Sequence, residues 1–278
     1  MVVKDVSPML NKATAKVAKV GKEGGHWYTQ QGELIELIAK KKANTGMTRT
    51  TLYHARQHQL CPGVTTIIGQ CDKPQLTLWR VRQGIMSALT LPRRASETED
   101  EWMKRVEIDM NETANKAKKL GTKIHGALDL HYQGKPFDQA FAKHVAGVRR
   151  VIEKHCSNQL SRWLPERAVV HPYGYATKSD LHSEEWCLDF KGTEGDQSHL
   201  DRMVHYDNHA MQLAATRAPM SSTMRCAIVY VSRTHHGAAS FVEVTQPNLE
   251  RGWDMFKSLL MYWQAKTNYK PNWAEKIT

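Results

Sequence analysis

The stretch GYATKSDLHSEEWCLDFKG, Gly174–Gly192, predicts more about the fold than any other part of the sequence. Its second half holds an apolar run that is typical of a short buried strand, Trp186, Cys187, Leu188 and Phe190. Successive side chains of a strand point to opposite faces. Asp189 and Lys191 should therefore project to one side, while Phe190 points into the protein.

The acidic residues of this stretch predict a nuclease centre. Asp189 lies inside the apolar run, where an ionised carboxylate is costly unless it is paired or bound to a metal ion. Asp180 lies on the preceding hairpin, and one or two carboxylates with waters and phosphates are what Mg²⁺ usually takes. Lys191 would act as a point charge near the attacked phosphate or its water. The alternative is a solvated turn with a surface ion pair. The apolar residues on either side of Asp189 favour the buried metal site over this alternative.

Length and composition bound the class of protein. The 278 residues suffice for one large domain or for one domain with an appendage. The hydrophobic fraction of 41% and the charged fraction of 24% are those of a soluble globular protein. No apolar run approaches a membrane span, and the first ten residues lack a secretory apolar core. We therefore expect a cytoplasmic protein without membrane association.

The net charge of +11 favours a polyanionic partner, nucleic acid first and an anionic membrane second. Residues 1–60 hold ten Lys and Arg against four Asp and Glu. Within them, Lys40–Lys42, Arg49 and Arg56 are candidate phosphate contacts, although each also fits an ordinary solvated surface. Residues 1–25 show little sign of packing and are expected to form a mobile arm.

The five cysteines are dispersed and contain no C-x-x-C pair. This spacing argues against a zinc ribbon, an iron–sulfur cluster and a disulfide framework. Most of them are expected to be small core residues. They are Cys61, Cys71, Cys156, Cys187 and Cys226.

Apolar periodicity predicts the helices of the first half. Residues 34–38 suggest a short helix, and Thr65 is a possible N-cap before a further apolar run. In a packed helix with Trp79, Ile85 and Leu89 inside, Arg80 and Arg82 would face outward. The longest helical stripe runs over residues 98–133, with a possible break at Gly121. His125 lies at the edge of that stripe, where a packed or half-exposed histidine is commoner than a ligand.

The second half of the chain predicts alternating helices and strands. An amphipathic helix covers Phe137–Ile152, and a further helix covers residues 198–217, buried along Met203, Tyr206, Ala210 and Leu213. That second helix aligns His205, His209, Gln212 and Thr216 on its polar side; the two histidines have zinc-ligand spacing but no accompanying carboxylate motif. Two strands joined by a turn at Thr234–Gly237 and a helix over 248–267 follow.

The overall expectation is an α/β domain with a small central mixed β-sheet flanked by helices, plus a helical N-terminal elaboration. Residues 1–60 would form the basic arm and elaboration, and residues 61–278 the main domain.

Over residues 60–265 the chain resembles the PD-(D/E)XK nucleases, in the RecB-like exonuclease branch that includes phage exonucleases and the mitochondrial genome maintenance exonuclease. The matching motifs occur in the family's order: the helix histidine in GTKIH (His125), the first-strand acid (Glu166), the hairpin aspartate (Asp180), D-x-K (Asp189 and Lys191) and the glutamine of MQLAAT (Gln212). Two positions depart from the pattern, since Lys178 stands near a usual glycine and Thr216 replaces a tyrosine.

The resemblance implies a restriction-endonuclease-like core and a metal-dependent DNA exonuclease. Lys191, Asp189, Asp180, Gln212 and Glu166 would be the catalytic residues. Asp180, Asp189, the Phe190 carbonyl and His125 would hold Mg²⁺ or Mn²⁺, with no iron–sulfur cluster. The candidate DNA contacts are Arg49, Arg56, Arg80, Arg82 and Lys178.

The resemblance also implies a setting in DNA recombination or repair, in a bacterial or phage-infected cell, beside a single-strand annealing protein. Two alternatives stay open: a non-catalytic DNA-binding or recombination-partner protein on the same fold, and an endonuclease of the same superfamily. The sequence does not decide the oligomeric state.

Overall fold

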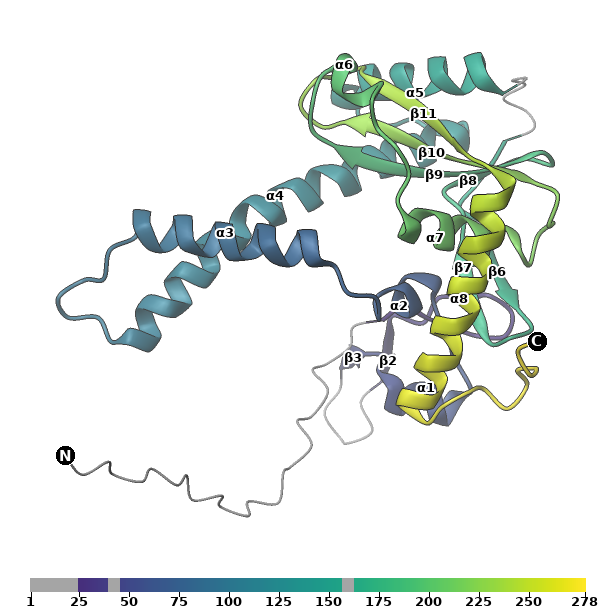
Figure 1. Ribbon diagram of the computed structural model, residues 1–278, viewed down its shortest axis with the longest axis horizontal. Coiled ribbons are helices and arrows are strands. Elements are labelled where there is room, and N and C mark those ends of the chain that lie inside the picture. Colours follow the sequence, from purple (N-terminus) through teal and green to yellow (C-terminus); the bar gives the residue numbers. More distant parts are fainter. Residues whose placement is uncertain (1–24, 40–45, 157–162) are drawn as a thin grey trace, which may run out of the picture.

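A five-stranded mixed sheet lies at the centre of the fold, in the order β11–β10–β9–β8–β5 (Figure 1). The computed structural model describes residues 25–39, 46–156 and 163–278. The strands are β5 (Leu164–Pro165), β8 (Leu181–His182), β9 (Trp186–Thr193), β10 (Arg225–Ser232) and β11 (Ala239–Val244). Only β9 and β10 pair in parallel; the other neighbours in this sheet pair antiparallel. The predicted α/β class with a small mixed sheet is confirmed.

The strand β9 is buried on both faces, as its apolar run predicted. Leu188 and Phe190 pack into a core with the helices α4 (Glu99–Tyr132) and α5 (Ala142–His155). Cys187 packs on the opposite face, in a core with α7 (Asp207–Arg217) and α8 (Gln246–Thr267). Because side chains alternate along the strand, Asp189 faces α7. The sheet is therefore the middle layer between two layers of helices.

A second core joins the N-terminal segment to the last helix. Trp27 of β1 (Trp27–Tyr28) and Leu60 are buried with Phe256 and Trp263 of α8. The hydroxyl of Tyr269 lies within hydrogen-bond distance of the carbonyls of Ala55 and Leu60, at 2.9 and 2.6 Å. The boundary expected between residues 60 and 61 thus falls inside one packed cluster.

Short elements surround this second core. They are the strands β2 (Leu37–Ala39), β3 (Met47–Arg49), β4 (Cys61–Pro62), β6 (Ala168–His171) and β7 (Tyr175–Lys178), and the helices α1 (Leu52–His58) and α2 (Val64–Ile68). The helix expected at residues 34–38 is wrong, because Leu37–Ala39 pairs antiparallel with β3. The proposed N-cap Thr65 lies inside α2, whose N-cap is Gly63. Residues 1–24 and Lys40–Lys42 lie outside the described residues.

The helix α3 (Pro74–Thr90) and the first half of α4 form a hairpin that projects from the body (Figure 1). Thr98 and Glu101 form a capping box at the start of α4. The expected break at Gly121 is absent, since α4 runs continuously from Glu99 to Tyr132. The expectation that Ile85 and Leu89 are packed is also wrong: their side chains are 55% and 73% exposed.

The connection from β9 to β10 contains two helices where the periodicity predicted one. The short helix α6 (Gln197–Leu200) ends well before α7, and residues 201–206 between them are not helical. Tyr206 is the N-cap of α7 and is 55% exposed, so its predicted burial is wrong. No helix in the described ranges is long and apolar enough to cross a membrane.

Burial of His171 makes the stability of the fold depend on pH. Its ring stacks on Tyr175 at 4.9 Å, its Nδ1 accepts a hydrogen bond from the Tyr173 amide, and burial lowers its pKa to about 4. The unfolded chain, with a pKa near 6.5, binds more protons between these values. We therefore expect the free energy of unfolding to fall, by up to about 3 kcal/mol from this group, as pH is lowered from about 6.5 to 4.

Urea unfolding of wild type and His171→Phe across this pH range measures the effect. The variant should show a shallower acid decline, because phenylalanine keeps an aromatic ring but cannot titrate. The matched control is His155→Phe, an exposed histidine stacked on Phe241. Parallel pH profiles for wild type and His171→Phe would contradict the assignment.

Candidate functional site

Four elements bring the central candidate residues together. Asp180 lies in the short link between β7 and β8, while Asp189 and Lys191 lie on β9. Gln212 comes from α7 and His125 from α4. These positions are separated by up to 87 residues in the sequence, so only the folded chain assembles the site.

Asp189, Lys191 and Gln212 form a closed triangle of polar contacts. Gln212 Nε2 donates a hydrogen bond to Asp189 Oδ1 at 2.6 Å, and Lys191 Nζ donates one to Gln212 Oε1 at 3.0 Å. Lys191 Nζ also lies 2.8 Å from Asp189 Oδ2. The side chain of Asp189 is almost fully buried, at 8% exposed, so the triangle supplies the partners that a buried charge requires. Gln212 thereby holds both charged groups in place.

Asp180 lies beside this triangle, and its carboxylate charge has fewer stabilising partners than that of Asp189. Its Oδ2 accepts a hydrogen bond from the Phe190 amide at 2.7 Å and lies 3.8 Å from His125 Nδ1. Burial, and then the negative charge of Asp189, raise the pKa of Asp180 to about 6. A half-buried carboxylate whose pKa is raised by burial and by a neighbouring negative charge is a setting that favours a bound cation.

Lys191 keeps its charge in spite of its partial burial. Burial alone would lower its pKa, but the neighbouring Asp189 and Asp180 outweigh that effect and leave the pKa raised above its usual value. An ammonium group with this environment is fully protonated near neutral pH. It is therefore available as a fixed positive charge and not as a general base.

The donor set fits a hard divalent ion held by few protein ligands. In the described part of the chain no three His, Cys, Asp or Glu side chains form a metal-holding group. Asp180 and Asp189 nevertheless match the demand of Mg²⁺ or Mn²⁺, which keeps several waters and takes one or two carboxylates plus phosphate oxygens. The Asp180 carboxylate is hydrogen-bonded to the amide of Phe190, directly after Asp189. A cation there would offset the negative charge of Asp189 that, after burial, raises the pKa of Asp180, and this supports the fit.

Glu166 lies near the site but outside the triangle. Its backbone amide is 3.3 Å from the Asp180 carbonyl, whereas its carboxylate pairs with Lys178 Nζ at 2.5 Å. Its φ of +49° is in the left-handed region, which is uncommon for a residue with a side chain. The geometry therefore gives Glu166 an ion pair at the edge of the site and not a place beside Asp189.

A pocket of about 200 Å³ opens next to Asp180 and Gln212. His26, Tyr28 and Thr65 also line it, and none of them was predicted from the sequence to be a site residue. They come from the N-terminal segment and α2, which no local pattern connects to the D-x-K strand. Such long-range neighbours carry no signal in a single sequence.

Thr216, where the resembling family has a tyrosine, has a packing role here. It is buried and its hydroxyl lies 2.6 Å from that of Thr177 on β7. The predicted polar side of α7 is thus wrong for Thr216 and for His209, which is also buried. His209 Nδ1 lies 3.2 Å from the Tyr230 hydroxyl, and burial lowers the pKa of His209 to about 4. His205 lies before the start of α7, and its ring nitrogen Nε2 contacts the side chain of Asn248. The structure therefore does not pair His205 with His209 as metal ligands.

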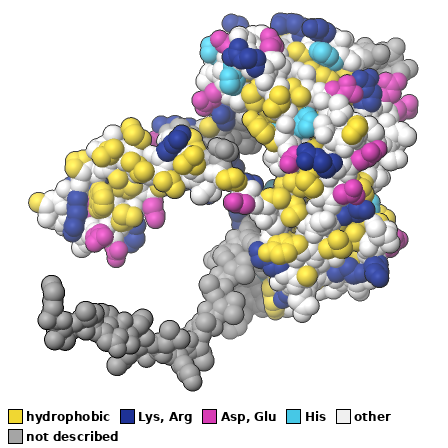
Figure 2. Space-filling view, in the orientation of Figure 1, with side chains coloured by type: hydrophobic (Ala, Val, Ile, Leu, Met, Phe, Trp, Pro, Cys, Tyr) yellow, Lys and Arg dark blue, Asp and Glu magenta, His cyan; other side chains and the backbone are white. Residues whose placement is uncertain are grey.

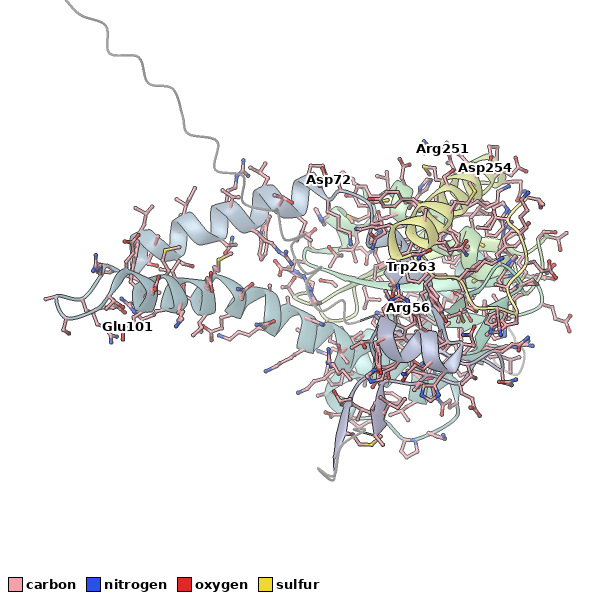
Figure 3. The ribbon with its side chains drawn as sticks, turned by 90° about the horizontal axis from the view of Figure 1, so that it is seen from below. Arg56, Asp72, Glu101, Arg251, Asp254 and Trp263 are labelled. Carbon is pink, nitrogen blue, oxygen red and sulfur yellow. The ribbon has the colours of Figure 1, made fainter. Side chains whose placement is uncertain are left out.

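The candidate DNA contacts are spread over the molecule. Lys178 lines the pocket beside Asp180, and Arg49 is exposed on β3. Arg56 donates a hydrogen bond to the Thr267 carbonyl at the end of α8, close to Trp263 in Figure 3. Arg80 and Arg82 are exposed on the projecting helix α3. The structure brings only Lys178 to the site itself.

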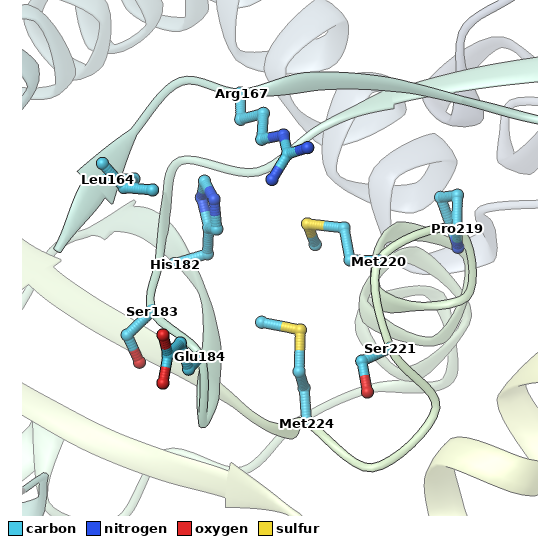
Figure 4. A pocket seen from close by; sticks show the side chains of 9 residues that line it. All are labelled: Leu164, Arg167, His182, Ser183, Glu184, Pro219, Met220, Ser221 and Met224. Carbon is cyan, nitrogen blue, oxygen red and sulfur yellow. The ribbon is translucent and has the colours of Figure 1, made fainter. Parts of the chain in front are cut away.

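A second pocket, of about 600 Å³, lies between β8 and the segment after α7 (Figure 4). Arg167 and His182 face the sulfur atoms of Met220 and Met224 across it. Neither Asp180 nor Asp189 lines this pocket. We therefore place the candidate chemistry at the Asp180 pocket.

No protein-family model matches this chain, and no curated protein sequence matches it.

Proposed function

We propose that this chain is a Mg²⁺- or Mn²⁺-dependent DNA exonuclease, built on the restriction-endonuclease-like core of the PD-(D/E)XK superfamily. The observation that carries the proposal is the Asp189–Gln212–Lys191 triangle with Asp180 beside it. It combines a buried and a half-buried carboxylate with one fixed ammonium group, which is the charge pattern that phosphodiester hydrolysis needs. The net charge of +11 adds support for a polyanionic substrate.

The protein groups have distinct parts in this proposal. Asp180 and Asp189 would hold the metal ion, with the Phe190 carbonyl and His125 as further candidates. The ion would supply Lewis-acid stabilisation of the phosphate and a more acidic bound water. Lys191 would place a positive charge against the phosphate oxygens, where negative charge grows in the transition state. Gln212 would keep Lys191 and Asp189 at their present separation.

The proposed biological setting is DNA recombination or repair in a bacterial or phage-infected cytoplasm, beside a single-strand annealing protein. Residues 61–278 would carry the nuclease residues, and residues 1–60 would add a basic elaboration that packs onto them through Trp27 and Leu60. Because metal and lysine both act on phosphate, the enzyme should show little base preference. The arginines and Lys178 would then serve the placement of the DNA strand, and Glu166 would act in catalysis only indirectly, by holding Lys178 beside the site.

The experiment that tests the proposal is a gel assay with end-labelled linear single- and double-stranded DNA beside closed circular DNA. We expect loss of the linear substrates with Mg²⁺ or Mn²⁺, no loss with EDTA, and intact circles. Cut circles would replace the exonuclease with an endonuclease of the same superfamily. Shifted but uncut DNA in every lane would favour the non-catalytic binding protein. Binding whose affinity does not fall with salt would count against nucleic acid altogether.

A further inference from the structure

The projecting hairpin, defined here as the arm (residues 73–112), exposes an apolar surface that the rest of the described chain does not cover. Figure 2 shows hydrophobic side chains gathered along it. Six large apolar side chains of α3 are between 41% and 73% exposed: Leu76, Leu78, Val81, Ile85, Met86 and Leu89. Monomeric soluble proteins rarely leave a contiguous surface of this kind open. The arm therefore has the character of an interface.

The exposed apolar residues of α3 form a continuous stripe along the helix. Leu78, Val81, Ile85 and Leu89 follow one another at spacings of three, four and four, which places them on one side of α3. On α4, Met103 and Ile108 are 45% and 74% exposed. Both helices of the arm thus expose apolar side chains to solvent, in addition to the side chains that pack between the two helices.

The charges of the arm are sorted between its two helices. The charged residues of α3 are Arg80 and Arg82 alone, and Lys73, Arg93 and Arg94 flank it, whereas residues 97–112 contain seven Asp and Glu against two Lys and Arg. Arg80, Arg82, Asp100 and Glu107 are exposed, and among the described residues none of the four has an ion-pair partner. Glu101 marks the acidic end at the tip of the arm (Figure 3).

We infer that the arms of two copies of this chain pair about a two-fold axis, with α3 of each copy against the first half of α4 of the other. In a two-fold interface the same surface must be complementary to itself. A basic α3 and an acidic α4 meet this condition twice, because both contacts of the pair join opposite charges. The product is a four-helix bundle in which the exposed apolar stripes form the core. This inference does not depend on the proposed nuclease activity.

The composition of the surface suits a stable pair. Stable interfaces bury about 800 Å² on each partner, around an apolar centre. The eight exposed apolar side chains of the arm supply such a centre, and the unpaired charges supply its rim. An unrelated partner would need an equally sorted pattern of its own, whereas a second copy carries it already.

Sedimentation velocity of the full chain at micromolar concentrations, without DNA or metal, tests the inference. We expect a concentration-dependent dimer for wild type. Ile85→Lys/Leu89→Lys should weaken the dimer by about tenfold or more, since each lysine would enter the apolar core of the bundle. The matched control is Met261→Lys, an exposed apolar position on α8 that should not change the dimer. Circular dichroism should be unchanged in every variant, as all three positions face solvent.

A charge-exchange experiment identifies the partner surface. Arg80→Glu/Arg82→Glu and Asp100→Lys/Glu107→Lys should each self-associate about tenfold or more weakly than wild type. When the two variants are mixed, the new acidic residues on α3 of one copy meet the new lysines on α4 of the other, and the unchanged basic α3 meets the unchanged acidic α4, so a heterodimer should form. A monomeric wild type, a dimer unaffected by Ile85→Lys/Leu89→Lys, or absence of the mixed dimer would each overturn the inference.

Discussion

Asp189→Asn is expected to reduce DNA cleavage by about a thousandfold or more while DNA affinity changes only a few-fold. Asparagine has nearly the same shape and still offers an oxygen to Gln212, so the fold should persist. It removes one of the two carboxylates and leaves Lys191 without its ion-pair partner. Loss of metal-dependent charge stabilisation typically costs several kcal/mol of transition-state energy. Lys191→Ala should have an effect of the same order for the complementary reason.

Single-turnover cleavage of linear DNA, with binding measured in EDTA, separates the two parts of this prediction. Lys178→Ala is the matched lysine control, since Lys178 pairs with Glu166 at the edge of the site. It should lower DNA affinity with little loss of the cleavage step. Mg²⁺ should raise the melting temperature of wild type but not that of Asp189→Asn, which tests metal binding without activity. Full activity of Asp189→Asn would refute the assignment of the site.

Gly252→Ala is expected to destabilise the protein by about 2–4 kcal/mol. A Cβ at this position would stand 2.7 Å from the backbone of Ala210 and 3.0 Å from the Met211 amide, so α7 and α8 could not keep their present separation. Gln212 follows directly on α7, and its shift would also open the polar triangle. Stability and cleavage should therefore be lost together.

Urea unfolding of Gly252→Ala beside Gly126→Ala measures this effect. Gly126 is an exposed position in α4 where an added Cβ meets nothing within 4 Å. Alanine there should stabilise the protein by up to about 1 kcal/mol, because it favours the helix without a clash. Equal stability of the two variants would mean that α7 and α8 are not in close contact at Gly252.

The local arrangement of β9 could be predicted from the sequence because it depends on strand alternation alone. Asp189 and Lys191 share a face and Phe190 enters the core, as the pattern required. The pocket beside them could not be predicted, since Tyr28, which lines it, lies 161 residues before Asp189 in the sequence. Spacing along the chain carries no information about such contacts.

Periodicity was misleading where an apolar stripe does not face the protein's own core. The stripe of α3 has the spacing of a packed helix, yet Ile85 and Leu89 remain exposed. Similarly, the stripe over residues 198–217 continues through a non-helical turn at 201–206. Periodicity reports which side of a segment is apolar, but it does not report what covers that side.

The shared core of the N-terminal segment and α8 has a consequence for synthesis of the protein. Trp27 and Leu60 leave the ribosome long before Phe256, Trp263 and Tyr269, which complete their packing. Until then these apolar side chains lack their native neighbours and are open to chaperones or to other nascent chains. The many contacts between distant parts of the sequence also slow folding, because large loops must close first. The core shared by the N-terminal segment and α8 can therefore form only after the last helix has been translated.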